Sequence, residues 1–307
     1  MTATATAKEF DYATGTISFP PEIAVIEVTN RCNLDCTICY RRAYLKEVGD
    51  MDFSLFKKIA RAIKGAKLIC CQGGGEPLLH PRIFDMLDYL REVSDPETIV
   101  MTTNATVLDR EMARRLASSK LDTLHVSIDG SDRETYERIR GFDFNQVVEN
   151  VRHFKSISRI RTVINFTAMK ETLESLLGMP NLMQHMGVES LNVQHLLRWN
   201  PQMHNLRVVD GAYDRFERIR AETLEEAKRL GVECTIPQIG PMDKCDLPFR
   251  QVYYNFKGKL APCCVAIKML LEKNYANVNG ARIREWRRRT GRGNFPKACR
   301  EFCYVKP

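Results

Sequence analysis

Three cysteines in one short loop restrict this chain more than any other feature of its sequence. Cys32, Cys36 and Cys39 follow an apolar, β-branched segment with the spacing C-x3-C-x2-C. Three thiolates on such a loop can bind three irons of a [4Fe–4S] cube and leave the fourth iron without a protein ligand. A reactive metal centre needs an open coordination position of this kind. The loop therefore predicts a reactive iron–sulfur centre, whereas a zinc knuckle or a buried cysteine group is disfavoured because no fourth cysteine lies nearby.

The number of cysteines also indicates a reducing compartment. The 307 residues include 11 cysteines, most of them in close pairs or triplets. The N-terminal residues hold no apolar segment typical of a signal peptide, and no apolar run approaches the roughly 18 residues of a membrane span. We therefore expect a cytoplasmic protein with no membrane association, in which the cysteines bind metal rather than form disulfides.

The positive charge of the chain is less informative. A net charge of +8 suits an acidic substrate or an acidic electron donor, but an ordinary solvated surface is the favoured interpretation. Much of the excess lies in Arg282–Arg300, which holds seven arginines and one lysine. Only two aromatic residues interrupt this run, so a solvated helix face is favoured over a nucleic-acid patch. A docking surface for an acidic electron donor of the flavodoxin type ranks between these two interpretations.

Short β-branched runs alternate with stretches of helical spacing from about residue 21 to residue 196. Repeated β-then-α units predict an α/β fold with a parallel sheet and right-handed crossovers. The pattern fits a partial (β/α)6 barrel as well as an open sheet, and in both the functional residues belong at the C-terminal ends of the strands. The expected strands are Ala24–Asn30, Lys67–Gly73, Thr98–Asn104, Thr123–Gly130, Arg161–Ala168 and Glu189–Leu196; the expected helices are Phe53–Ile63, Ile83–Val93, Arg110–Ser118, Val147–Ile157 and Leu173–Met186.

The alternation stops after Leu196, which predicts a change in organisation. Tyr213–Leu230 is expected to form one charged helix. From Pro237 onwards the chain is rich in Gly and Pro and holds five of the 11 cysteines, so a metal site is the natural means of fixing it. The expected division is an N-terminal extension (1–20), a barrel (21–205), a linker and helix (206–240) and a small iron–sulfur domain (241–307).

Four motifs in register resemble the radical S-adenosylmethionine (SAM) superfamily. They are the cluster loop EVTNRCNLDCTICY at Glu27–Tyr40, the glycine-rich Gly73–Pro77, the pair Thr103 and Asn104, and SIDG at Ser127–Gly130. Ile38 departs from the family pattern, in which an aromatic residue is commoner at this position. The resemblance covers residues 24 to about 196 and implies a partial radical SAM barrel.

The resemblance also implies roles for these residues. SAM would bind the open iron through its amino and carboxylate groups, and one electron would cleave it to a 5′-deoxyadenosyl radical. Glycines would let the backbone approach the SAM ammonium without a clash from a Cβ atom. The implied SAM-binding residues are Gly74, Gly75 and Glu76 for the amino group, Thr103, Asn104, Ser127 and Asp129 for the ribose and carboxylate, and Arg140 near the carboxylate.

The C-terminal cysteines resemble the SPASM/twitch extension of many radical SAM enzymes. Cys245, Cys263, Cys299 and Cys303 can saturate a second [4Fe–4S] cube, and the segment has the expected order of a hairpin, cysteines and a short helix. Full SPASM domains carry more cysteines, so the shorter twitch form fits better. A structural zinc site with four cysteine ligands is the alternative.

Cys264 stands apart from the remaining cysteines because it adjoins an expected cluster ligand. A thiol at this position could donate hydrogen to a substrate radical, or Cys263 and Cys264 could exchange roles as ligand. Cys70, Cys71 and Cys234 are explained as small buried hydrophobes.

The favoured function is that of a radical SAM enzyme acting on a C–H bond of a small sugar or aminocyclitol-type natural product, as in antibiotic biosynthesis. Epimerisation with Cys264 as hydrogen donor is preferred, and a dehydrogenase with the auxiliary cluster as electron acceptor is the first alternative. The second is a peptide-modifying enzyme, disfavoured because no room for a leader-binding domain precedes the first strand. An external flavodoxin or ferredoxin is the expected electron donor.

Overall fold

A single curved, mostly parallel sheet organises the molecule. The computed structural model describes residues 10–18, 20–41, 46–198, 203, 205–208, 211–264, 266 and 272–303. Nine strands lie in the order β7-β6-β5-β4-β3-β2-β1-β8-β9, and only the β8–β9 pair is antiparallel. They are β1 (Ile23–Ile26), β2 (Leu68–Cys71), β3 (Thr98–Thr103), β4 (Thr123–Ser127), β5 (Arg161–Ala168), β6 (Ser190–His195), β7 (Glu233–Thr235), β8 (Gln251–Tyr254) and β9 (Leu260–Ala261).

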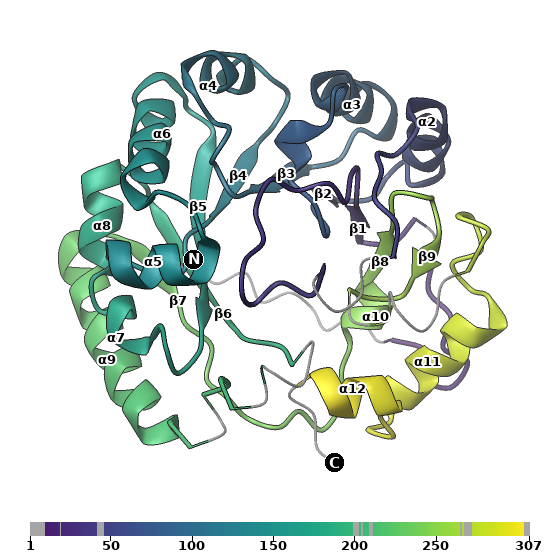
Figure 1. Cartoon of the computed structure of the whole chain (residues 1–307). Helices are drawn as coiled ribbons and strands as arrows, with labels where there is room; N and C mark the ends of the chain where they lie inside the picture. Colours follow the sequence, from purple (N-terminus) through teal and green to yellow (C-terminus); the bar gives the residue numbers. More distant parts are fainter. Residues whose placement is uncertain are drawn as a thin grey trace.

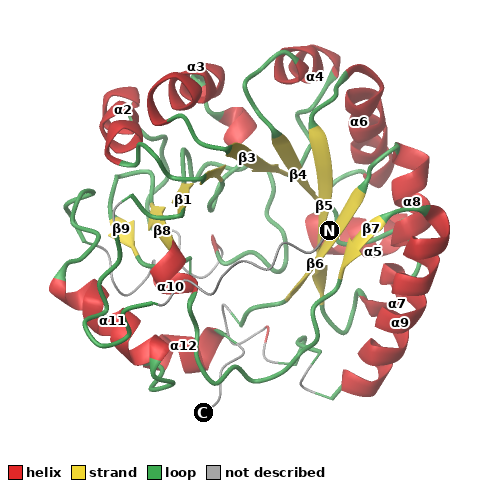
Figure 2. Cartoon of the chain, turned by 180° about the vertical axis from the view of Figure 1, so that it is seen from behind, coloured by secondary structure: helices red, strands yellow, loops and turns green. Residues whose placement is uncertain are grey.

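Helices cover the outer face of this sheet, and the fold is a partial α/β barrel (Figure 1). The end strands β7 and β9 lie on opposite sides of the ring (Figure 2). The helices are α2 (Phe53–Ala62), α3 (Ile83–Tyr89), α4 (Arg110–Ala117), α5 (Arg133–Arg140), α6 (Phe144–Ile157), α7 (Leu173–Leu176), α8 (Met179–Met186), α9 (Tyr213–Leu230), α10 (Leu247–Arg250), α11 (Ala281–Gly291) and α12 (Lys297–Phe302), with a 3-10 turn at Pro77–Leu79 and a π-helical turn at Leu90–Ser94.

Aspartates begin several of these helices. The side chains of Asp52, Asp109, Asp132 and Asp143 each accept a hydrogen bond from a backbone N–H in the first turn of α2, α4, α5 and α6. These first-turn N–H groups have no partner within the helix, so a capping carboxylate stabilises each helix by about 1 kcal/mol. The loops that follow β3 and β4, which carry two of the motifs, lead into two of these capped helices, α4 and α5.

The six strands expected from the sequence are confirmed, and differ mainly in length. β1, β2 and β4 end earlier than expected, so most of their motif residues lie in loops beyond the strand ends, although Ser127 is still the last residue of β4. Leu173–Met186 is divided into α7 and α8 around Gly178, because Pro180 lacks the N–H that a continuous helix would need. β7 was not expected from the sequence. It follows α9, whose C-cap Gly231 adopts the left-handed conformation with φ +70°.

The C-terminal segment also joins the sheet. β8 pairs in parallel with β1, with Ile23 opposite Gln251 and Ile26 opposite Tyr254, and the hairpin to β9 continues beyond it. The domain boundaries expected from the sequence stay a prediction. The expected hairpin before Cys263 is confirmed.

Several barrel strands, β5 most clearly, present apolar residues to the helices and polar residues to the interior. On β5, Ile164 and Phe166 are fully buried, whereas the alternate residues Asn165 and Thr167 line an interior cavity. Successive side chains of a strand point to opposite faces, so this alternation makes an apolar outer layer and a polar lumen. No helix within the described ranges is long and apolar enough to span a membrane.

Replacing Phe166 with alanine should destabilise the barrel strongly, because its fully buried ring packs between β5 and the helices. We expect a loss of about 3–5 kcal/mol, seen as a lower urea midpoint by far-UV circular dichroism under anaerobic conditions. Ile157→Ala is the control, since Ile157 is 43% exposed at the end of α6 and should change stability by less than about 0.5 kcal/mol. Equal effects of the two variants would contradict the assigned core.

Candidate active site

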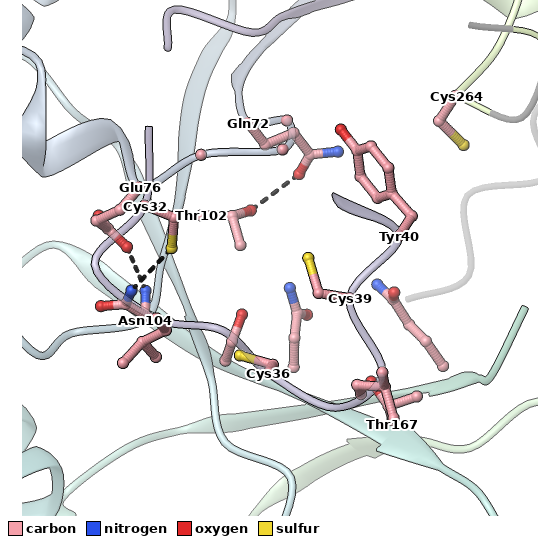
Figure 3. A pocket seen from close by; sticks show the side chains of 18 of the residues that line it. Cys32, Cys36, Cys39, Tyr40, Gln72, Glu76, Thr102, Asn104, Thr167 and Cys264 are labelled. Carbon is pink, nitrogen blue, oxygen red and sulfur yellow. Dashed lines mark hydrogen bonds between the residues drawn. The ribbon is translucent and has the colours of Figure 1, made fainter. Parts of the chain in front are cut away.

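The cysteine loop lies at the C-terminal ends of the barrel strands. Cys32, Cys36 and Cys39 line one cavity of 390 Å³ together with residues from β2 to β6. Figure 3 shows the three cysteines around this cavity, with Asn104 beside Cys32. The loop is tied to the end of α5, where the backbone N–H of Thr37 donates to the carbonyl of Ile139 over 3.0 Å. The three cysteines expected to bind the first cluster are therefore brought together.

Hydrogen-bond donors point at two of these sulfurs. The Asn104 side-chain amide lies 3.7 Å from Cys32 Sγ, and an Arg140 guanidinium nitrogen lies 3.8 Å from Cys36 Sγ. Burial raises the pKa of the Cys32 and Cys39 thiols, so bare thiolates are disfavoured there. Donors and bound iron both stabilise the thiolate form, and the donor set fits an iron–sulfur cluster.

The glycine-rich turn packs directly against the cysteine loop. A Cβ atom on Gly75 would lie 2.4 Å from the carbonyl oxygen of Thr29 and 2.5 Å from that of Arg31. On Gly74 it would lie 2.6 Å from the hydroxyl of Tyr40. The next residue continues the contact, because the backbone N–H of Glu76 donates to the Arg31 carbonyl over 2.7 Å. These glycines are needed for loop packing, a reason that the sequence pattern alone does not supply.

Glu76 joins the second and third motifs. Its fully buried carboxylate accepts hydrogen bonds from the hydroxyl of Thr103 (2.8 Å) and from the backbone N–H groups of Asn104 (2.7 Å) and Leu78 (3.0 Å). Burial raises the pKa of Glu76 to about 7, against the effect of these donors. Such a carboxylate is suited to a cationic ligand group. Gly74, Gly75, Glu76, Thr103, Asn104 and Ser127 all line the cavity.

Asp129 and Arg140 form a buried ion pair. An Arg140 Nη atom lies 2.5 Å from Asp129 Oδ2, and the other carboxylate oxygen accepts from the backbone N–H of Thr167 over 2.6 Å. Arg140 lines the cavity, while Asp129 is fully enclosed behind it. The structure thus places Asp129 to hold Arg140, and its direct contact with SAM stays a prediction.

The C-terminal cysteines gather beside α11 and α12. Cys299 lies on α12, and Cys303 directly follows this helix, with its backbone N–H donating to the carbonyl of Cys299. Cys263 follows β9, and the backbone N–H of Cys245 donates to the carbonyl of Thr290 on α11 over 3.1 Å. Burial raises the pKa of all four thiols, and charges on Cys299 and Cys303 act on Cys263.

Four cysteine thiols can hold either a [4Fe–4S] cube or a single zinc ion. Among the residues that the structure describes, no group of three or more Cys, His, Asp or Glu side chains is arranged to hold a metal ion. Assignment of these four residues as ligands stays a prediction.

Cys263 and Cys264 lie in different environments. Cys263 is 5% exposed within the apolar cluster that also contains Cys299, whereas Cys264 lines the active-site cavity. Figure 3 shows Cys264 on the opposite side of the view from Cys32, beyond Tyr40. Cys264 thus lines the cavity, and its charge also acts on Cys263 and Cys303 of the C-terminal group.

Sequence reasoning missed the polar lumen of the barrel. Besides the motif residues, the cavity is lined by neutral amide and hydroxyl side chains, namely Gln72, Thr102, Asn165, Thr167 and Gln194. Thr102 donates to Gln72 over 2.9 Å, and Asn192 donates to Asn165 over 2.9 Å. Polar residues at every second position of β5 and β6 were the available signal, because a barrel interior is otherwise apolar.

Gly75→Ala should disrupt the first iron centre, because the added methyl group meets two backbone carbonyls of the cysteine loop. We expect iron bound after anaerobic reconstitution to fall by the amount held at Cys32, Cys36 and Cys39. Gly240→Ala is the matched control, since a Cβ atom there meets nothing within 4 Å. Full iron content in Gly75→Ala would show that the turn does not position this loop.

Comparisons with known proteins agree with this geometry. Residues 26–183 match the model of the radical SAM superfamily. The chain is 31% identical over 200 residues to a tungsten-containing aldehyde ferredoxin oxidoreductase cofactor-modifying protein of Pyrococcus furiosus, covering 62% of this chain and 55% of that protein. It is 28% identical over 191 residues to a probable GTP 3′,8-cyclase of Saccharolobus solfataricus, covering 59% of this chain and 58% of that protein. The chain thus spans a little over half the length of these relatives.

A solved structure extends the likeness to most of the fold. SuiB of Streptococcus suis, bound to S-adenosylmethionine, superposes with a TM-score of 0.69 over 87% of this chain and 65% of SuiB, at 16% sequence identity. At this identity the likeness is one of fold. The family match covers more than half of the chain, and it contains the cysteine loop, the glycine-rich turn and Arg140. The chain belongs to the radical SAM superfamily.

Proposed function

We propose that this enzyme inverts a carbon centre of a small sugar or aminocyclitol-type substrate, with Cys264 as the hydrogen donor. The observation that supports this proposal is the shared cavity. It is lined by Cys32, Cys36 and Cys39, by neutral amide and hydroxyl groups, and by the thiol-bearing Cys264. The groups proposed for hydrogen abstraction and for hydrogen return therefore line the same cavity.

The cofactor-binding residues act by holding SAM in this cavity. When bound, the reduced cluster and SAM supply a 5′-deoxyadenosyl radical that removes a hydrogen atom from a substrate C–H bond. Glu76 would face the SAM ammonium, together with the backbone of Gly74 and Gly75. Thr103, Asn104 and Ser127 would contact its ribose and carboxylate. Arg140 would pair with that carboxylate, held in place by Asp129.

Cys264 would complete the inversion. Its S–H bond breaks, a C–H bond forms on the opposite face of the substrate carbon, and a thiyl radical remains on the sulfur. One electron and one proton then restore the thiol. Radical SAM enzymes need a reductant, and we propose a flavodoxin or ferredoxin, with a second [4Fe–4S] cluster on Cys245, Cys263, Cys299 and Cys303 as the relay.

The polar lumen supports the proposed substrate class. Asn165, Thr167 and Gln194 offer neutral donors and acceptors, which suit a substrate with several hydroxyl or amino groups. The names of the two curated relatives, a cofactor-modifying protein and a GTP cyclase, also point to small molecules. The likeness to SuiB is one of fold and gives no reason to prefer a peptide.

A dehydrogenase is the second candidate, favoured by the position of the C-terminal cysteines. The same carbon radical could lose a proton from its hydroxyl group and an electron to the second cluster, giving a ketone. Cys263 lies next to Cys264, so that cluster would lie close to the cavity.

Changing Cys32, Cys36 and Cys39 together to alanine should abolish SAM cleavage while about four of roughly eight irons remain. The two cysteine groups lie on separate loops, so loss of the first cluster leaves the second intact. Iron analysis and electron paramagnetic resonance of the anaerobically reconstituted protein measure the result. Zinc at the C-terminal cysteines, or no remaining iron, would contradict the second cluster.

The reaction is tested with panels of aminocyclitols and sugars and, in parallel, short peptides, using 5′-deoxyadenosine formation to find a substrate. Inversion in heavy water should add one deuterium to the product, because thiol protons exchange with solvent, whereas dehydrogenation removes two hydrogens. Cys264→Ala should form 5′-deoxyadenosine without the inverted product and keep roughly eight irons.

Cys263→Ala is the matched control for the neighbouring thiol, and it should lose about four irons. Full inversion by Cys264→Ala would end the donor assignment, and a ketone from the unaltered enzyme would favour the dehydrogenase. Turnover of peptides alone would overturn the substrate class.

A further inference from the structure

One arginine of the basic C-terminal run is fully buried. Arg287 on α11 has no exposed surface, so the interpretation of this run as a solvated helix face is wrong for Arg287. Arg282, five residues earlier on the same helix, is exposed. Removing a guanidinium from water is costly unless an anion and hydrogen bonds compensate. The burial of Arg287 therefore requires a physical reason.

The hydrogen bonds of Arg287 supply only part of this compensation. Its Nε donates to the carbonyl of Pro248 over 2.6 Å, and Nη1 donates to the carbonyl of Val278 (2.8 Å) and to Asn279 Oδ1 (3.0 Å). All of these acceptors are neutral. The second terminal nitrogen, Nη2, is buried without a hydrogen-bond partner, and no described residue forms an ion pair with the guanidinium. The charge thus lacks a counter-charge among the described residues.

The groups around Arg287 belong to segments that carry C-terminal cysteines. Thr290, one turn further on α11, accepts the hydrogen bond from the backbone N–H of Cys245, and Pro248 follows Cys245 by three residues. Burial lowers the pKa of Arg287 to about 10, and a charge on Cys263 acts in the opposite direction. Arg287 is therefore enclosed by the segments that carry two of the four C-terminal cysteines.

We propose that Arg287 is the internal counter-charge of the C-terminal iron–sulfur cluster and raises its reduction potential. The inference rests on the proposed second cluster. A cube with four thiolate ligands carries two negative charges when oxidised and three when reduced. A fixed cation nearby stabilises the reduced form more than the oxidised form, and net charge and hydrogen bonding are known determinants of cluster potential.

The potential is best measured with the first cluster removed. In full-length protein carrying Cys32→Ala, Cys36→Ala and Cys39→Ala, an anaerobic redox titration followed by electron paramagnetic resonance reports the C-terminal cluster alone. Arg287→Met removes the charge and should reduce the reduced-to-oxidised ratio at a fixed potential by at least tenfold, equivalent to ~59 mV for one electron. Arg287→Lys keeps the charge and should shift less.

Arg282→Met is the matched control, because it removes an exposed charge from the same helix. It should leave the potential unchanged. Arg287→Met with about four irons and the parent potential would overturn the counter-charge role. Absence of iron in the parent triple variant would instead overturn the second cluster itself, so the two failures are distinguishable.

If Arg287→Met loses the cluster, Arg287→Gln and Arg287→Lys distinguish a requirement for charge from a requirement for packing. Arg287→Gln is neutral but keeps amide donors for the carbonyls of Pro248 and Val278. Iron retained by Arg287→Lys but lost from Arg287→Gln supports a requirement for charge. Iron retained by Arg287→Gln at the parent potential, or lost from both variants, overturns the proposal in favour of a packing role.

Discussion

The carboxylate of Glu27 joins the parts on which the active site depends. It follows β1 directly and accepts hydrogen bonds from the Tyr253 hydroxyl (2.5 Å), the Gly74 backbone N–H (3.0 Å) and the Tyr40 hydroxyl (3.3 Å). These donors come from β8, the glycine-rich turn and the end of the cysteine loop. One buried acceptor thus fixes the mutual positions of the C-terminal segment, the turn and the loop, because each donor would otherwise be left unsatisfied.

The register of the parallel strands does the remaining positioning. β1 pairs with β2 so that Ile26 lies opposite Cys71. The loops that follow the two strands therefore begin at the same edge of the sheet. The glycine turn can then approach the cysteine loop within van der Waals distance, and Glu76 reaches the end of β3. The motifs follow successive, neighbouring strands of one parallel sheet. The topology of the sheet alone therefore brings them together at one edge.

The arrangement of motifs at successive strand ends explains which structural features could be predicted from the sequence. The six barrel strands and the convergence of Cys32, Glu76 and Asn104 could be predicted because each depends on periodicity or on a motif at a strand end. The pairing of β8 with β1 could not, since it joins residues more than two hundred positions apart and β8 has only four residues. The burial of Arg287 was equally hidden, because its partners are mainly backbone carbonyls, which any residue type supplies.

The two buried arginines illustrate what a sequence conceals about charge. Arg140 lies beside Cys36 but is neutralised by Asp129, so the pair adds little net charge near the first group of cysteines. Arg287 has no such carboxylate among the described residues. Under the proposal that a cluster binds at each site, the neutralised pair would leave the first potential low, and the unpaired cation would raise the second. This proposed difference depends on one aspartate, which pairs with Arg140 and has no counterpart beside Arg287 among the described residues.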